Sequence, residues 1–91
     1  MAFVYILVSL RDNSYYVGSC YDVSVRLALH NAGKVRSTKA SRPWELKYIE
    51  RYDTLREARK REDQIKSWKK RSAIENLINR GSAINLGGPI A

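Results

Sequence analysis

A glutamate lies in line with apolar residues on one predicted helix of the chain. Glu62 follows Ala58 by four residues and precedes Ile65 by three, which places all three on one stripe of a helix. A carboxylate in such a stripe is costly unless a cation, a hydrogen-bond donor or a metal lies beside it. Two interpretations follow: Glu62 takes part in chemistry, or it only borders the core and pairs with Lys66 four residues later.

A second pair of reactive side chains lies on an earlier predicted helix. Arg26 and His30 are four residues apart, so their side chains are neighbours on one helical face. A guanidinium beside an imidazole suits a phosphate group. The alternative is an ordinary pair of solvated surface side chains, since charged helical residues usually face water.

Basic side chains gather in two segments. Residues 55–71 contain eight basic residues and three acidic ones, with Trp68 among them, and residues 34–42 form a polar basic loop. Such clusters indicate a surface that binds a polyanion through its phosphates, whereas the alternative for the first segment is a solvated helix face with Trp68 in the core. The expected nucleic-acid contacts in the two segments are Lys34, Arg36, Ser37, Thr38, Lys39, Arg42, Arg59, Lys66, Lys69 and Lys70.

Composition agrees with this interpretation. The 91 residues suffice for one compact domain, and a formal net charge of +8 with a pI near 9.9 favours a polyanionic partner. The single cysteine, Cys20, excludes an internal disulfide and fits a reducing compartment. Because we find neither a signal-peptide pattern nor a run of about 18 apolar residues, we expect a cytoplasmic protein without membrane contact.

Three apolar segments rich in β-branched and aromatic residues predict strands over 3–10, 15–20 and 44–52. Three helices are expected from capping signals. The first is residues 23–32, between an Asp22 cap and Gly33; the second begins after Thr54 and runs to about Lys69; the third begins at a capping box formed by Ser72 and Glu75 and ends at Gly81.

The element order β-β-α-β-α-α predicts an α+β fold, in which helices flank a small three-stranded mixed or antiparallel sheet. In the third strand, Leu46, Tyr48 and Tyr52 alternate with polar residues. We expect residues 1–80 to form the domain and residues 81–91 to form a flexible tail, because the last residues lose both charge and periodicity.

Two of the predicted strands carry tyrosines. Tyr5, Tyr15 and Tyr16 could simply fill a pleated, half-buried surface, and Gly18 near a strand end indicates a bulge or a close approach of a ligand to the backbone. Successive side chains of a strand point to opposite faces, so we expect Tyr15 to face away from Tyr16 and to be structural.

Taken in order, these residues resemble the GIY-YIG nuclease superfamily, in particular its small single-domain members similar to the N-terminal nuclease domain found in excinuclease ABC. Phe3-Val4-Tyr5 stands where the first motif would be, and Tyr16-Val17-Gly18 matches the second. Arg26 falls at the family's helical arginine, His30 at the Tyr or His one turn later, and Glu62 at the glutamate that binds metal. The correspondence covers about residues 3–78.

The resemblance implies a metal-dependent DNA endonuclease with a role in repair or recombination. Tyr5, Tyr16, Arg26, His30 and Glu62 would then surround one cleft. Glu62 would hold a single Mg²⁺ or Mn²⁺ ion, and Arg26 would neutralise charge on the phosphoryl oxygens. Tyr16 is the first candidate for activating water, with Tyr5 as the alternative or orienting partner, while His30 would relay or accept a proton. Gly18 would give the backbone room near a phosphate.

Three positions depart from the family pattern. Phe3 replaces the first glycine, Ser19 stands where the excinuclease domain has a lysine thought to ionise the tyrosine, and Asn76 or Asn79 would have to replace that domain's late asparagine. A rival hypothesis is therefore a nucleic-acid-binding module with weak or no cleavage, or an accessory to a partner protein. Either DNA or RNA fits the basic surface.

Overall fold

The central element of the fold is a three-stranded antiparallel sheet in the order β2-β1-β3. The computed structural model describes residues 1–86. Strands β1 (Ala2–Ser9) and β2 (Tyr15–Cys20) form a hairpin, and β3 (Trp44–Tyr52) has the bounds expected from the sequence. Asn13, in the hairpin turn, adopts a left-handed φ of 65°, which its short polar side chain tolerates. The predicted element order and fold class are confirmed.

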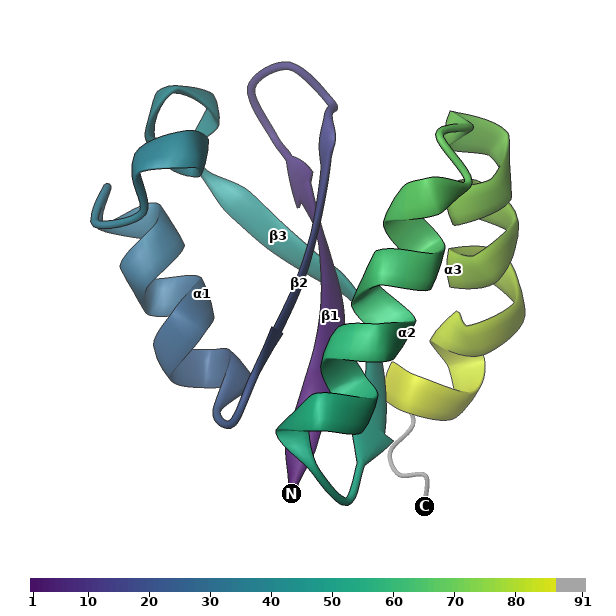
Figure 1. Cartoon of the computed structure of the whole chain (residues 1–91). Helices are drawn as coiled ribbons and strands as arrows, with labels where there is room; N and C mark the ends of the chain where they lie inside the picture. The colour runs from purple at the N-terminus through teal and green to yellow at the C-terminus, as the bar shows by residue number, and fades with distance from the viewer. Residues whose placement is uncertain (87–91) are drawn as a thin grey trace.

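Helices cover both faces of the sheet (Figure 1). Helix α1 (Val23–Asn31) and the short 3₁₀ helix η1 (Arg36–Ser41) lie against one face, while α2 (Leu55–Ser67) and α3 (Arg71–Leu86) lie against the other. The sequence predicted a loop in place of η1. Because strand side chains alternate between the faces, β1 contributes to two separate clusters of buried apolar side chains.

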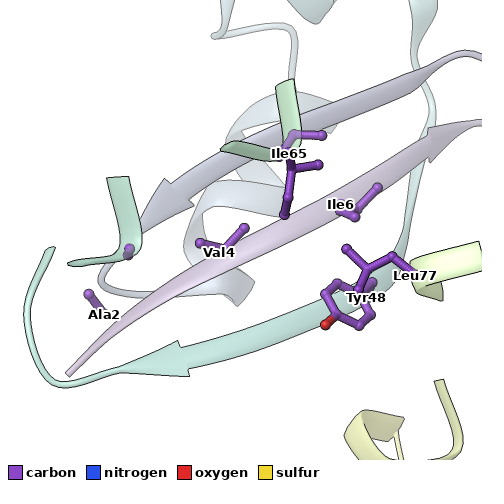
Figure 2. Close-up of a cluster of buried hydrophobic side chains, with 8 residues drawn as sticks. Ala2, Val4, Ile6, Tyr48, Ile65 and Leu77 are labelled. Carbon is purple, nitrogen blue, oxygen red and sulfur yellow. The ribbon is translucent and has the colours of Figure 1, made fainter. Parts of the chain in front are cut away.

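The cluster under α2 and α3 contains several completely buried aliphatic side chains. Val4 and Ile6 of β1 meet Ile65 of α2 and Leu77 of α3, with Tyr48 of β3 beside them (Figure 2). Val4, Ile6 and Ile65 are completely inaccessible to solvent. Burying each such side chain contributes roughly 1.5–3 kcal/mol, which makes this cluster the main source of stability for the face opposite α1.

The expected alternation along β3 is interrupted. The β1–β3 register shifts between Ile6 and Leu7, so that Leu7 pairs with Leu46 and Ile6 with Tyr48. Lys47 is the extra residue of this bulge, and it moves Leu46 and Tyr48 to opposite faces of the sheet. Spacing alone predicts that residues two apart share a face, so the bulge was not apparent from the sequence.

The two ends of α1 follow the predicted capping signals. The Asp22 side chain accepts a hydrogen bond from the Val25 backbone N–H at the start of the helix. At the other end Gly33 has a φ of 77°, and the N–H groups of Gly33 and Lys34 bond back to the carbonyls of His30 and Leu29. This Schellman motif turns the chain sharply toward η1.

The start of α2 matches the sequence, but the bounds of α3 do not. The capping box of Thr54 and Glu57 is present. The second predicted capping box is wrong, because α3 already begins at Arg71 and Glu75 instead pairs with Arg71 at 3.1 Å. The end at Gly81 is also wrong, since the helix continues to Leu86; one glycine costs only about 1 kcal/mol within a helix.

The predicted boundary between residues 80 and 81 therefore falls inside α3. The flexible tail remains a prediction, and its residues 87–91 lie outside the part of the chain that the structure describes. None of the helices in the described part is long and apolar enough to cross a membrane.

Candidate active site

Tyr5 and Tyr16 face the same side of the sheet, toward α1. Their ring centroids are 6.2 Å apart, and Tyr16 also lies 4.8 Å from the His30 ring. Tyr15 packs in the cluster on the opposite face, as the strand alternation predicted. The hairpin and α1 thus bring together three of the residues singled out from the sequence, Tyr5, Tyr16 and His30.

A buried chain of hydrogen bonds runs through this group. The Tyr5 hydroxyl is 3.0 Å from His30 Nε2, and His30 Nδ1 is 2.7 Å from Thr38 Oγ1. Thr38 in turn donates to the Val35 carbonyl at 3.3 Å. His30 and Thr38 are 0% and 1% exposed. Thr38 was predicted to contact phosphate from the surface, and its burial makes that assignment wrong.

Tyr5 is as deeply buried as its two partners, with 1% of its surface exposed. Burial raises the pKa of Tyr5 to about 12, although a hydrogen bond from Arg26 acts in the opposite direction. At neutral pH Tyr5 is therefore a neutral hydroxyl without access to water. This arrangement suits an orienting group better than a base that activates water.

Gly18 lies directly beneath the two tyrosines. A Cβ atom at this position would lie 2.5 Å from the Tyr5 hydroxyl oxygen, 2.6 Å from Tyr5 Cζ and 3.0 Å from Tyr16 Cε2. The absence of a side chain thus makes room for an aromatic ring, whereas the sequence had suggested room for a phosphate.

We expect Gly18→Ala to lower the free energy of unfolding by about 1–3 kcal/mol, as for other overpacked cores, because the buried Tyr5 ring has little room to move. Urea denaturation followed by circular dichroism measures this change. An unchanged midpoint would show that the two rings shift without cost and that the close approach is not structural.

Arg26 reaches this group from α1. Its guanidinium lies beside Tyr5, and the interaction with the Tyr5 hydroxyl is the main reason that the pKa of Arg26 is raised. Arg26 Nε is buried and has no hydrogen-bond partner among the described residues. A buried N–H without a partner is costly, and an anionic oxygen bound at this point would satisfy it.

Glu62 lies at the edge of the sheet, where α2 packs beside β2. Ser19 donates a hydrogen bond to Glu62 Oε1 at 2.5 Å, and Lys66 Nζ lies 2.6 Å from Glu62 Oε2. The predicted pairing of Glu62 with Lys66 is confirmed. Lys66 Nζ is also 6.0 Å from the centroid of the Tyr16 ring, which links the carboxylate to the tyrosines. Glu62 raises the pKa of Lys66 and keeps it charged.

The donor set fits a weak divalent-metal site. No group of three or more His, Cys, Asp or Glu side chains suited to a metal occurs in the described part of the chain, so Glu62 would be the one carboxylate ligand. Mg²⁺ is commonly held by one or two carboxylates together with waters and substrate phosphates. The Lys66 ammonium shows that the Glu62 carboxylate already accommodates a cation.

A groove of about 400 Å³ leads away from this site between the first turns of α1 and α2. Ser19 and Arg26 line it at one place, and the exposed Arg59 of α2 lines it at another. Tyr21, 65% exposed, also forms part of its wall. The groove is therefore lined by Ser19, which donates to Glu62, by the Arg26 side chain and by the exposed Arg59.

Most of the predicted nucleic-acid contacts are exposed, as binding to a polyanion requires. The two asparagines considered as substitutes for the family's late asparagine, Asn76 and Asn79, instead line a separate hollow of about 590 Å³ beside Trp68. Arg61 pairs with the half-buried Glu50 at 3.0 Å, so it is structural. The exposed predicted contacts are Lys34, Arg36, Ser37, Lys39, Arg42, Arg59, Lys66, Lys69 and Lys70.

His30 should make the stability of the fold depend on pH. Burial and the Arg26 charge lower the pKa of His30 below its usual value of about 6.5, and the other titratable groups against it are Tyr5 and Tyr16. As pH falls below about 6.5, the unfolded chain takes up a proton before the folded chain does. Stability should therefore be full above this pH and decline as pH falls below it, toward the lower pKa of His30 in the folded state.

Thermal unfolding at several pH values tests this expectation, with His30→Gln as the variant that cannot titrate. The variant should lose the decline that the wild type shows below about pH 6.5, whatever its absolute stability. A wild-type midpoint that is constant over this range would contradict the account of a neutral, buried imidazole.

The fold and the site together define a class of protein. A model of the GIY-YIG catalytic domain matches residues 1–79, and the chain belongs to this family. Its similarity extends to UPF0213 proteins, which are of similar length. The chain is 45% identical over 80 residues to a UPF0213 protein of Staphylococcus epidermidis, covering 87% of this chain and 95% of that protein.

Two further relatives are also UPF0213 proteins. A UPF0213 protein of Staphylococcus aureus is 40% identical over 79 residues, covering 86% of this chain and 95% of that protein. The solution NMR structure of a UPF0213 protein from Bacillus halodurans matches with a TM-score of 0.57 and 29% sequence identity, covering 99% of this chain and 90% of that one. The predicted family is thus confirmed.

Proposed function

We propose that the protein is a metal-dependent endonuclease that hydrolyses phosphodiester bonds of DNA. The observation that carries the proposal is the buried Nε of Arg26, which has no hydrogen-bond partner in the described structure, on a side chain that lines a groove together with a second cation, Arg59. A phosphate oxygen supplies the missing acceptor, and its charge is favourable there. Membership of the GIY-YIG family supports the same substrate class.

Each side chain of the site has a role that its position suits. Arg26 binds the scissile phosphate and stabilises the charge that develops on its oxygens. Glu62, oriented by Ser19, holds one Mg²⁺ or Mn²⁺ ion. When bound, the ion polarises the phosphate and stabilises the leaving oxygen. Lys66, whose Nζ lies 6.0 Å from the centroid of the Tyr16 ring, supplies a positive charge beside Tyr16, whereas position 19 of this chain is a serine.

Tyr5 and Tyr16 have different proposed roles in catalysis. Tyr16 is half-buried, whereas Tyr5 is 1% exposed and bonded to His30. We therefore assign activation of the attacking water to Tyr16, and an orienting role to Tyr5 and His30. The exposed basic residues of the 34–42 loop, with Arg59, Lys69 and Lys70, would bind the flanking DNA backbone.

An assay with labelled DNA tests the function. Duplex, nicked, branched and single-stranded DNA are incubated with the wild-type protein in Mg²⁺, in Mn²⁺ and in EDTA, and RNA is included as a fifth substrate. Cleavage of at least one DNA that stops in EDTA is the expected result. Tight binding of these DNAs without cleavage in either metal would contradict the proposal.

One observation favours a second candidate, a nucleic-acid-binding module without useful cleavage. Both carboxylate oxygens of Glu62 are occupied, one by the Ser19 hydroxyl and the other by the Lys66 ammonium. A metal would compete with the Lys66 ammonium for this carboxylate, which weakens its affinity. The same assay separates the two functions, because the module binds DNA and leaves it intact.

A further inference from the structure

We propose that Thr38 is a positioning residue, which fixes the tautomer of His30 and thereby keeps the Tyr5 oxygen available to hold Arg26. Thr38 lies in η1, and its hydroxyl oxygen lies 2.7 Å from His30 Nδ1. The proposed consequence for cleavage rests on the proposed function. The tautomer itself can be measured without any cleavage.

The direction of each hydrogen bond in the buried series follows from Thr38, which lies at the end farthest from Arg26. The Thr38 hydroxyl donates its single proton to the Val35 carbonyl, so its oxygen is left to accept from His30 Nδ1. His30 therefore carries its proton on Nδ1 and, being neutral, presents a lone pair on Nε2. Tyr5 donates its hydroxyl proton to that lone pair.

The direction of the hydrogen bond between Tyr5 and His30 determines how the Tyr5 oxygen can interact with Arg26. With its proton directed to His30, the Tyr5 oxygen is free to accept from the guanidinium beside it, and the hydroxyls of Tyr5 and Thr38 and both ring nitrogens of His30 have partners. The reversed tautomer would place a proton on Nε2 facing Tyr5. The Tyr5 hydroxyl, 1% exposed, would then lose the acceptor that His30 provides. Thr38 thus favours the arrangement in which Arg26 is oriented and its Nε remains free for phosphate.

Two substitutions separate the hydroxyl from the shape of the side chain. Thr38→Ser keeps the hydroxyl, while Thr38→Val keeps the volume and removes it. Without the hydroxyl, a proton on Nδ1 has no acceptor in this buried position, so the Nε2-protonated form gains population. Because the chain contains a single histidine, ¹⁵N NMR of the imidazole reports the tautomer without ambiguity.

The wild type and Thr38→Ser should show Nδ1 protonated and Nε2 unprotonated, and Thr38→Val should show a mixture or the reverse. On a DNA that the wild type cleaves, Thr38→Val should lower kcat by about 10- to 100-fold with little change in KM, and Thr38→Ser should retain most activity. Circular dichroism confirms that each variant is folded.

Protonation of Nε2 in the wild type would overturn the proposal, and so would a Thr38→Val variant with an unchanged tautomer. If the protein cleaves no DNA, the proposed function fails, while the NMR result still decides whether Thr38 sets the tautomer. If the tautomer shifts but the cleavage rate does not, the link from Thr38 to Arg26 is wrong although the nuclease assignment stands.

Discussion

Glu62→Gln is expected to reduce DNA cleavage by about a thousandfold or more, because loss of metal binding removes several kcal/mol of transition-state stabilisation. The amide keeps the shape of the side chain and an oxygen that can accept from Ser19. The folded structure should therefore survive. Single-turnover cleavage of the preferred DNA measures the effect, and thermal unfolding confirms the fold.

Asp63→Asn is the matched control for this variant. Asp63 is the next residue of α2, is exposed, and undergoes the same chemical change with the same loss of charge. It should cleave DNA at nearly the wild-type rate. Equal losses in both variants would show that only the overall charge of the helix matters, and full activity of Glu62→Gln would remove Glu62 from the site.

Arg26→Lys should lower the cleavage rate by about 100- to 1,000-fold while DNA binding changes much less. Lysine keeps the positive charge but lacks Nε and the planar fork that binds a phosphate through two donors. Loss of one oriented donor to a developing oxyanion has an effect of this size in other enzymes. The measurement is single-turnover cleavage together with binding by fluorescence anisotropy, both in the same buffer.

Arg51→Lys provides the comparison for this second variant. Arg51 is an exposed residue of β3, outside the proposed site, and the same substitution there should leave cleavage nearly unchanged. An Arg26→Lys variant as active as the wild type would mean that a point charge suffices. The partnerless Nε would then have no part in catalysis.

Local signals in the sequence predicted much of the scaffold. Asp22, Thr54 and Gly33 mark helix ends through hydrogen bonds or backbone conformations that depend only on near neighbours, so their roles could be inferred and are confirmed. The opposite orientations of Tyr15 and Tyr16 follow from the two-residue period of a strand. Ser72 and Gly81 were misleading, since α3 begins one residue before Ser72 and continues through Gly81 despite their local preferences.

The interior of the site could not be predicted in the same way. Tyr5 and His30 are 25 residues apart, and His30 and Thr38 are eight apart across a sharp turn. Residue type placed Thr38 among the surface phosphate contacts, because a small polar residue in a basic loop is usually exposed. Only the packing of η1 against α1 shows that the Thr38 side chain is buried. Glu62 was located correctly on its helix, but its bond to Ser19 depends on how α2 packs beside β2.

The central claim is that Glu62 holds the single divalent ion when DNA phosphate occupies the groove beside Arg26. Electron paramagnetic resonance of Mn²⁺ measures this directly, with wild type and Glu62→Gln each titrated in the presence of saturating DNA at a temperature where cleavage is negligible. The wild-type complex should bind one Mn²⁺ that the variant complex does not. Equal binding of Mn²⁺ by both complexes would contradict the claim.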